Sequence, residues 1–219
     1  MLQLCAALAV FVGGHILISR TGLRQRATDA IGEIAYLALF TLFAVGSMLW
    51  VSLSFRAAPW QEVWLPPLGL RWLSVAFIAV ALWLLVDGLV ARLRARPTLP
   101  PPIAAYAVTR QPIMVAIVLW AGAHMLVRGY AATVLLFGGF AVLGVAGALS
   151  QDRKARAYHN EAWPAYAATT SLAPLLALIS GRARLSPGDI GWWPGIVSLA
   201  LLLAMLWLHP LIFGLSPLP

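Results

Sequence analysis

The stretch IAYLALFTLFAVGSMLWVSLS, residues 34–54, decides the fold class, because it contains no charged side chain. The hydrocarbon core of a bilayer is about 30 Å thick, and a helix needs roughly 20 apolar residues to cross it. An uncharged stretch of this length is typical of a transmembrane helix. We therefore predict that the chain is an integral membrane protein.

The composition of the whole chain points the same way. Of its 219 residues, 62% are hydrophobic and 10% are charged, and the mean hydropathy is +0.88. Soluble domains are about 45–50% apolar and about 25% charged. A soluble chain of this size has too little interior to bury the excess apolar surface. The single cysteine, Cys5, excludes an internal disulfide framework and any multi-cysteine metal or iron–sulfur site.

Working outward from residues 34–54, the sequence predicts an all-α bundle of about six transmembrane helices in one domain, residues 1–219. The first span is not preceded by a basic segment and has no small-residue cleavage site, so we expect it to be retained. The segment 163–180 contains Pro164 and Pro174 and predicts a short interfacial or re-entrant helix. The six predicted spans are residues 2–19, 34–54, 72–91, 111–129, 132–149 and 192–213.

The net charge of +8 has a topological explanation. Twelve of the 15 Lys and Arg residues fall in the first, third and fifth gaps between the spans, and three fall in the second and fourth. Because basic loops stay in the cytoplasm, this alternation predicts a bacterial inner-membrane protein with both termini in the periplasm. The same placement assigns the positive charge to anionic headgroups of the lipid bilayer, so no nucleic-acid partner is expected.

Two short segments point to internal symmetry. Gly13-Gly-His15-Ile-Leu-Ile-Ser19 in the first span resembles Gly122-Ala-His124-Met-Leu-Val-Arg128 in the fourth. These spans run in opposite directions, so the two halves are candidates for inverted three-helix repeats. With a rise of 1.5 Å per residue, the two histidines are expected to differ in depth by roughly 12 Å.

His15 and His124 are the main candidates for a functional site. An ionisable side chain is costly inside a bilayer and marks a site by default, although a lone histidine is often a hydrogen-bonded packing residue. Zinc would need further ligands, and the chain has no HExxH or CxxC motif. Haem iron needs only two, so we predict that His15 and His124 are its axial ligands. Ligation by one histidine alone would leave the iron five-coordinate and open to a small ligand.

The other ionisable residues have simpler explanations. Asp87 lies near the cytoplasmic end of the third predicted span, close to Arg92 and Arg94, and is expected to form an ion pair within that helix. His159 is expected to be solvated in a loop, and His209 to lie at the interface.

The cytoplasmic face offers two further contacts. We expect Glu33, with Arg20 or Arg24, to contact a haem propionate or another helix. Motifs for nucleotide chemistry or hydrolysis are absent from the sequence, since it has no glycine-rich phosphate loop and no Ser-His-Asp spacing.

Several motifs, spread over nearly the whole chain, resemble those of the NnrU family. The strongest is Trp120-x-x-x-His124 followed by Leu136-Phe-Gly-Gly-Phe140. The others are Phe11-x-x-x-His15, Gly22-Leu-Arg24, Gly32-Glu33, Pro112-Ile, and Trp163-x-x-Tyr166-x-x-x-Thr170 before Pro174.

NnrU proteins are similar to the plant and cyanobacterial 15-cis-zeta-carotene isomerase, a membrane enzyme with b-type haem. The resemblance implies haem b at His15 and His124 and redox-dependent cis–trans isomerisation of a hydrophobic polyene. Bacterial NnrU is also linked with denitrification, in the production of functional nitrite and nitric oxide reductases, which makes nitric oxide a second expected ligand. The alternative is a membrane transporter, or an assembly or scaffold factor, without haem.

Overall fold

The computed structural model describes residues 1–20 and 22–219, with the side chains of Ser19 and Arg20 outside the description. The described chain is helical and contains no strand, apart from an isolated bridge between Glu62 and Tyr130. The all-α prediction is therefore confirmed. The helices are α1 (Leu2–Arg20), α2 (Leu23–Ile31), α3 (Glu33–Arg56), α4 (Leu70–Ala95), α5 (Ala105–Val108), α6 (Pro112–Val127), α7 (Ala131–Tyr158), α8 (Trp163–Thr169), α9 (Leu176–Ile179) and α10 (Trp192–Phe213), with a 3-10 turn at Pro187–Asp189.

Each stretch predicted to span the membrane is helical, and four helices are long and apolar enough to cross: α3, α4, α7 and α10. A bent pair, Leu2–Ile18 with Leu23–Ile31, is a fifth candidate, and its two parts meet at 79°. Helix α6 has 16 residues, which is shorter than a typical span. The structure thus supports a membrane-spanning helical protein, and the number of six spans stays a prediction.

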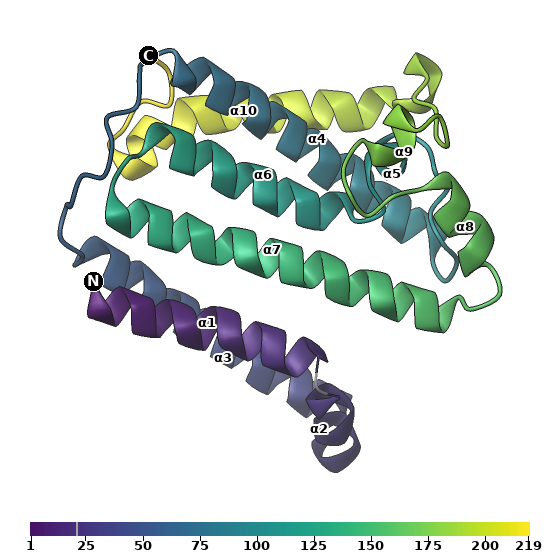
Figure 1. Cartoon of the computed structure of the whole chain (residues 1–219). Helices are drawn as coiled ribbons and strands as arrows, with labels where there is room; N and C mark the ends of the chain where they lie inside the picture. Colours follow the sequence, from purple (N-terminus) through teal and green to yellow (C-terminus); the bar gives the residue numbers. More distant parts are fainter. Residues whose placement is uncertain (21) are drawn as a thin grey trace.

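The long helices lie roughly along one axis and alternate in direction, with both termini at the same end (Figure 1). Helix α7 lies between α1 and α6 and packs against both. Helix α4 packs against α6 and α10, and α1 packs against α3. This arrangement places α7 between the helix that carries His15 and the helix that carries His124.

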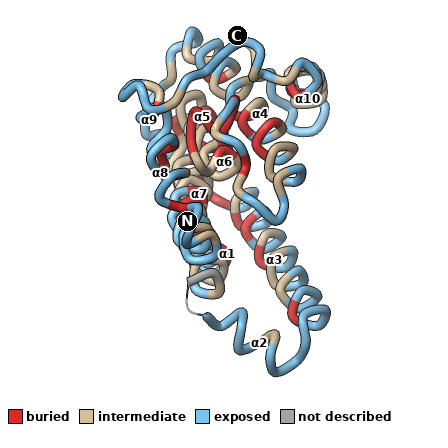
Figure 2. The backbone as a smooth tube through the Cα atoms, turned by 90° about the vertical axis from the view of Figure 1, so that its right-hand side faces the viewer, coloured by how far each residue is buried: buried red, intermediate tan, exposed pale blue. Residues whose placement is uncertain are grey.

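The buried residues follow the facing sides of these helices (Figure 2). Leu4, Leu8 and Phe11 of α1 belong to one apolar cluster, with Val51 of α3. Ala81 and Leu84 of α4, Ala105 and Val108 around α5, and Ala116 of α6 form a second one. The outer faces of α3 and α10 carry exposed Leu, Ile and Trp side chains. A lipid-facing surface has this character, because hydrocarbon solvates such side chains.

The helix packing does not follow the expected inverted repeat. A twofold relation between the halves would pair the α4–α6 contact with one between α10 and α1. Instead α10 packs on α4, and no comparably extensive contact joins α1 and α10 in the described part of the chain. The likeness between the two halves is local to the two histidine segments.

The segment expected to form one short helix near 163–180 forms two, α8 and α9. Thr170 ends α8 with extended backbone, and its hydroxyl donates a hydrogen bond to the carbonyl oxygen of Tyr166. Leu175 then adopts a positive φ of 64°, and its N–H donates to the carbonyl oxygen of Val108. The segment turns back to contact α5, so tertiary hydrogen bonds divide the predicted helix.

Candidate functional site

His15 lies on α1 among aromatic rings. Its ring centroid is 4.5 Å from that of Phe11 and 5.2 and 5.9 Å from those of Phe40 and Phe43 on α3. Its Nδ1 atom lies 2.6 Å from the carbonyl oxygen of Phe11, one helical turn earlier. The imidazole is half-buried, between α1 and α3.

His124 lies on α6 in a similar aromatic setting. Its ring stacks on Phe137 of α7, with the centroids 4.5 Å apart and the planes inclined by 16°. The ring of Trp120 is 5.1 Å away, and the carbonyl oxygen of Trp120 lies 2.8 Å from Nδ1 of His124. Each histidine therefore follows an aromatic residue by four positions and bonds to the carbonyl of that residue.

These hydrogen bonds determine the tautomer of the neutral rings. A carbonyl oxygen only accepts, so Nδ1 of each ring must carry the proton and donate it. The Nε2 atom then bears the lone pair that a metal ion requires. Neither Nε2 atom has a hydrogen-bond partner among the described residues. Each imidazole on its own is suited to ligate iron.

The structure does not bring the two imidazoles together. His15 is linked to His124 through Phe11, Phe140 of α7 and Trp120, whose successive centroids are 5.9 and 5.4 Å apart. These rings fill the path between the two histidines. A macrocycle bound to both at once would have to displace Phe140. As a pair, the histidines do not form a ready axial site in this arrangement.

A cleft of about 730 Å³ opens next to α1, one turn beyond His15. Its basic lining residues are Arg24 of α2 and Arg153 and Lys154 of α7. Glu33 contacts Arg24 at 3.6 Å, so the expected contact to another helix is present, while the side chain of Arg20 lies outside the described residues. Arg153 and Lys154 have no ion-pair partner in the described ranges, so they are available to an anionic group.

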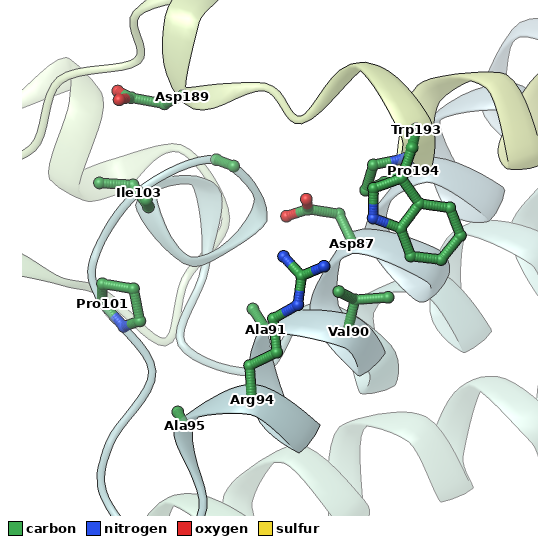
Figure 3. Close-up of a pocket in the computed structure, with 11 residues that line it drawn as sticks. Asp87, Val90, Ala91, Arg94, Ala95, Pro101, Ile103, Asp189, Trp193 and Pro194 are labelled. Atoms are coloured by element: carbon green, nitrogen blue, oxygen red, sulfur yellow. The ribbon is translucent and has the colours of Figure 1, made fainter.

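Asp87 behaves differently from the sequence prediction. Its carboxylate accepts a hydrogen bond from the backbone N–H of Ala105 at 3.1 Å, and no ion pair joins it to Arg92 or Arg94 in the described structure. Figure 3 shows Asp87 and the guanidinium of Arg94 pointing into a pocket between α4 and the N-terminal end of α10. The prediction of an ion pair within the helix is wrong, because the chain after α4 folds back and supplies an N–H donor.

Of the two remaining histidines, His209 lies within electrostatic range of His124, and His159 lies at the C-terminal end of α7. His209 of α10 hydrogen-bonds through Nδ1 to the carbonyl oxygen of Leu215, and His159 packs against the ring of Tyr158. In the described chain, no three His, Cys, Asp or Glu residues lie close enough together to hold a metal ion.

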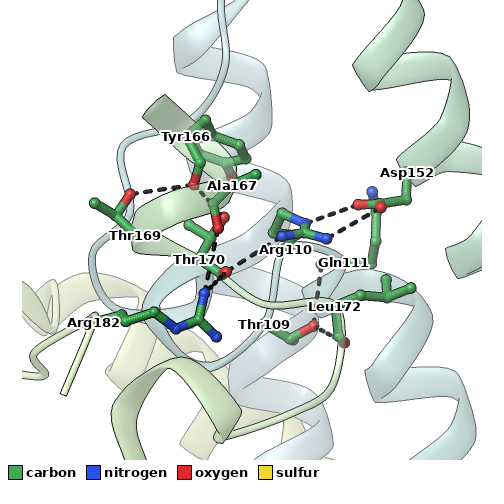
Figure 4. A network of polar contacts seen from close by, with 10 residues as sticks. All are labelled: Thr109, Arg110, Gln111, Asp152, Tyr166, Ala167, Thr169, Thr170, Leu172 and Arg182. Atoms are coloured by element: carbon green, nitrogen blue, oxygen red, sulfur yellow. Dashed lines mark hydrogen bonds and ion pairs between the residues drawn. The ribbon is translucent and has the colours of Figure 1, made fainter. Parts of the chain in front are cut away.

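A polar network missed by the sequence analysis joins α6, α7 and α8 (Figure 4). Arg110 forms a bidentate ion pair with Asp152, with N···O distances of 2.9 and 3.2 Å. It also donates to the carbonyl oxygen of Thr170 and lies 5.2 Å from the ring centre of Trp163. Arg182 donates to the same carbonyl oxygen. The network fastens the segment after α8 to the end of the bundle.

Two buried tyrosines beside this network stay in the neutral form. Burial raises the pKa of Tyr106 to about 12, and its hydroxyl donates to the carbonyl oxygen of Gly88 at 3.4 Å. Burial likewise raises the pKa of Tyr166. Both phenols therefore stay protonated at any physiological pH.

The fold and these sites define a class: an all-helical membrane protein with histidines set among aromatic rings inside the bundle. The chain matches the family described as NnrU protein over residues 3–217. It therefore belongs to the NnrU family, as the motifs around His15 and His124 predicted. No curated protein and no solved structure matches the chain.

Proposed function

We propose that this NnrU protein is a haem b protein of the bacterial inner membrane and that His15 and His124 are its ligand residues. The observation that carries the proposal is the shared geometry of the two rings. Each donates its Nδ1 proton to the carbonyl of the residue four positions earlier, which directs an unprotonated Nε2 away from the helix backbone.

The surroundings of His15 favour a macrocycle with acidic side groups. Aromatic rings from α1 and α3 offer flat apolar surfaces, and the adjacent cleft carries Arg153 and Lys154. These cations are suited to bind propionate groups, since charge-assisted hydrogen bonds to carboxylates are strong.

Because the two histidines are separated, an experiment must decide whether one of them or both ligate the iron. Ligation by His15 or His124 alone leaves an open position on the iron. Ligation by both requires Phe140 to be displaced, because its ring lies between those of Phe11 and Trp120.

When bound, haem supplies an iron whose axial affinity depends on its redox state. The protein supplies an apolar, aromatic surrounding that excludes water and suits a hydrophobic polyene or nitric oxide better than an ion. We propose redox-dependent cis–trans isomerisation of such a polyene as the activity, with a role in nitrite and nitric oxide reductase function as the pathway-level alternative.

The experiment is to measure haem per protein in the detergent-purified chain and in His15→Ala and His124→Ala. His159→Ala is the matched control, because it removes a histidine of the same chain that ends α7 and packs on Tyr158, away from the two aromatic sites. We expect the control to keep the wild-type haem content and at least one of the two test variants to lose it. Loss in both indicates ligation by both residues.

Equal haem in the wild type and all three variants would contradict the assignment of the ligands. No haem in the wild type, after expression with ample haem supply, would remove the haem proposal. The transporter or scaffold alternative would then be the better account. Wild-type recovery from the membrane fraction serves as the check on insertion in every variant.

A further inference from the structure

His209 of α10 lies at the same end of the bundle as His124 of α6. Both helices have their C-terminal ends at the end of the molecule that carries the two chain termini (Figure 1). Ser74, in the second turn of α4, donates a hydrogen bond to the carbonyl oxygen of Ala123 at 2.9 Å. His124 is therefore level with the start of α4.

The histidine of α10 is level with the same part of α4. Helix α10 runs antiparallel to α4, and Ser198 donates to the carbonyl oxygen of Leu82 at 3.4 Å. His209 follows Ser198 by eleven residues, about three helical turns, so both side chains lie on the face of α10 that packs against α4. Eleven residues before Leu82 is Arg71, whose guanidinium donates to the carbonyl oxygen of Leu218, in the tail after α10, at 2.8 Å. The two imidazoles therefore share one depth in the bundle.

The two rings also lie near one another. His209 lies within electrostatic range of His124, and its effect there exceeds that of Arg128, which is four residues from His124 on the same helix. Within the described chain, the only aromatic ring in contact with His209 is that of Phe213, with the centroids 4.8 Å apart. No other aromatic side chain stands against this imidazole, whereas Phe140 lies in the path from His124 to the imidazole of α1.

The hydrogen bond of His209 leaves free the atom that iron requires. Nδ1 lies 2.8 Å from the carbonyl oxygen of Leu215, and a carbonyl only accepts, so Nδ1 of the neutral ring donates. Nε2 then bears the lone pair and has no hydrogen-bond partner among the described residues. A bond of this kind is common at a helix end, but here the acceptor belongs to a tail that Arg71 holds against α4. The tail thus determines the tautomer of the ring.

We propose that His209 is the second axial ligand of a haem held at His124. The inference rests on the proposed function, and it fills the position that ligation by His124 alone would leave open. Neutral imidazoles with a free Nε2 are ligands of haem iron, and each of these two has an aromatic ring beside it, Phe137 or Phe213. One ligand then comes from α6 and the other from α10.

The test is the spin state of the haem in the detergent-purified full chain, read from the absorption and electron paramagnetic resonance spectra of the oxidised protein. We expect the wild type to be low-spin, because two imidazoles ligate the iron. His209→Ala should keep haem but become high-spin, and added imidazole should restore the low-spin spectrum by occupying the vacated position. His15→Ala and the control His159→Ala should stay low-spin.

A second variant keeps a ligand at the same position. His209→Met should remain low-spin and should raise the midpoint potential of the haem, because a thioether in place of one imidazole favours the reduced iron. His159→Met is its control, and it should leave the potential unchanged.

The failure of this inference is distinguishable from the failure of the haem proposal. A low-spin spectrum in His209→Ala, or an unchanged potential in His209→Met, would overturn the inference while the haem proposal stands. Conversion to high-spin by His15→Ala would overturn it as well, since the second imidazole would then come from α1. Absence of haem from the wild type, after expression with ample haem supply, would remove both.

Discussion

At the scale of single residues, Arg110 makes three kinds of contact at the end of the bundle. It combines an ion pair, a hydrogen bond to a main-chain carbonyl and a contact with an aromatic face. Its side chain is 14% exposed and that of Asp152 is 18% exposed. Removing one member of such a pair leaves the other charge poorly solvated.

We predict that Arg110→Ala lowers the free energy of unfolding by about 3 kcal/mol, the lower end of the range for buried pairs, because some solvent access remains. Unfolding of the purified protein in mixed detergent micelles measures this loss. Arg153→Ala, which removes an exposed cation, should stay within about 0.5 kcal/mol of the wild type.

A double-mutant cycle separates pairing from packing. Because Arg110 and Asp152 share one interaction, the double variant should lose less stability than the sum of the two single variants. Strictly additive losses would show that the ion pair contributes nothing beyond the separate contacts of each residue.

The sequence identified His15 and His124, because an ionisable residue stands out in a long apolar stretch. It did not identify the pairing of Arg110 with Asp152, since these residues are 42 positions apart and each also fits a solvated loop. Asp87 was misassigned for a related reason: its partner is a backbone N–H of Ala105, which leaves no mark in the sequence. Local chemistry was thus predictable, and long-range partners were not.

At the scale of elements, the connection between α3 and α4 is fastened to the turn between α6 and α7. The carbonyl oxygen of Gly129 accepts N–H bonds from Val63 and Trp64, at 2.7 and 3.2 Å. A Cβ atom at position 129 would overlap the main-chain carbonyl of Trp64. Only glycine fits this approach of two backbones.

We predict that Gly129→Ala lowers the free energy of unfolding by about 2 kcal/mol, since one of the two backbones must shift. Gly138→Ala is the control within α7, where a Cβ atom meets nothing within 4 Å. That control should be neutral or stabilising by up to about 1 kcal/mol, because alanine favours the helix. Similar losses in both variants would contradict the account of this turn.

The positions of the long helices followed from hydropathy alone, and each predicted stretch is helical. The division of residues 163–180 into α8 and α9 could not be predicted from hydropathy. The hydrogen bonds that cause it come from Val108 and from the Arg110 network. The bend after α1 likewise has no clear signal in hydropathy. Helix existence is a local property, whereas bends depend on tertiary partners.

At the scale of the whole molecule, the alternating helices place both termini at one end and the basic loops at the other (Figure 1). The charge distribution predicts that the basic end is cytoplasmic. The sequence did not predict which helices pack together, because apolar faces toward lipid and toward neighbouring helices have the same composition. For that reason, the helix packing differs from the inverted repeat that the two histidine segments indicated.

Labelling of single cysteines in a Cys5→Ser background tests the orientation. Asn160→Cys lies at the basic end and Gln61→Cys at the end of the termini. We predict that an impermeant maleimide labels Gln61→Cys in intact spheroplasts and labels Asn160→Cys only after permeabilisation. The reverse pattern would invert the orientation, and labelling of both in intact spheroplasts would contradict an odd number of spans between them.

The central claim is that this NnrU protein holds haem among the aromatic rings of its bundle. The most direct measurement is the absorption spectrum of the detergent-purified protein, first oxidised and then reduced with dithionite. The account predicts a sharp Soret band in the oxidised protein, with resolved α and β bands on reduction if both histidines ligate. A featureless spectrum from protein expressed with ample haem supply would contradict it.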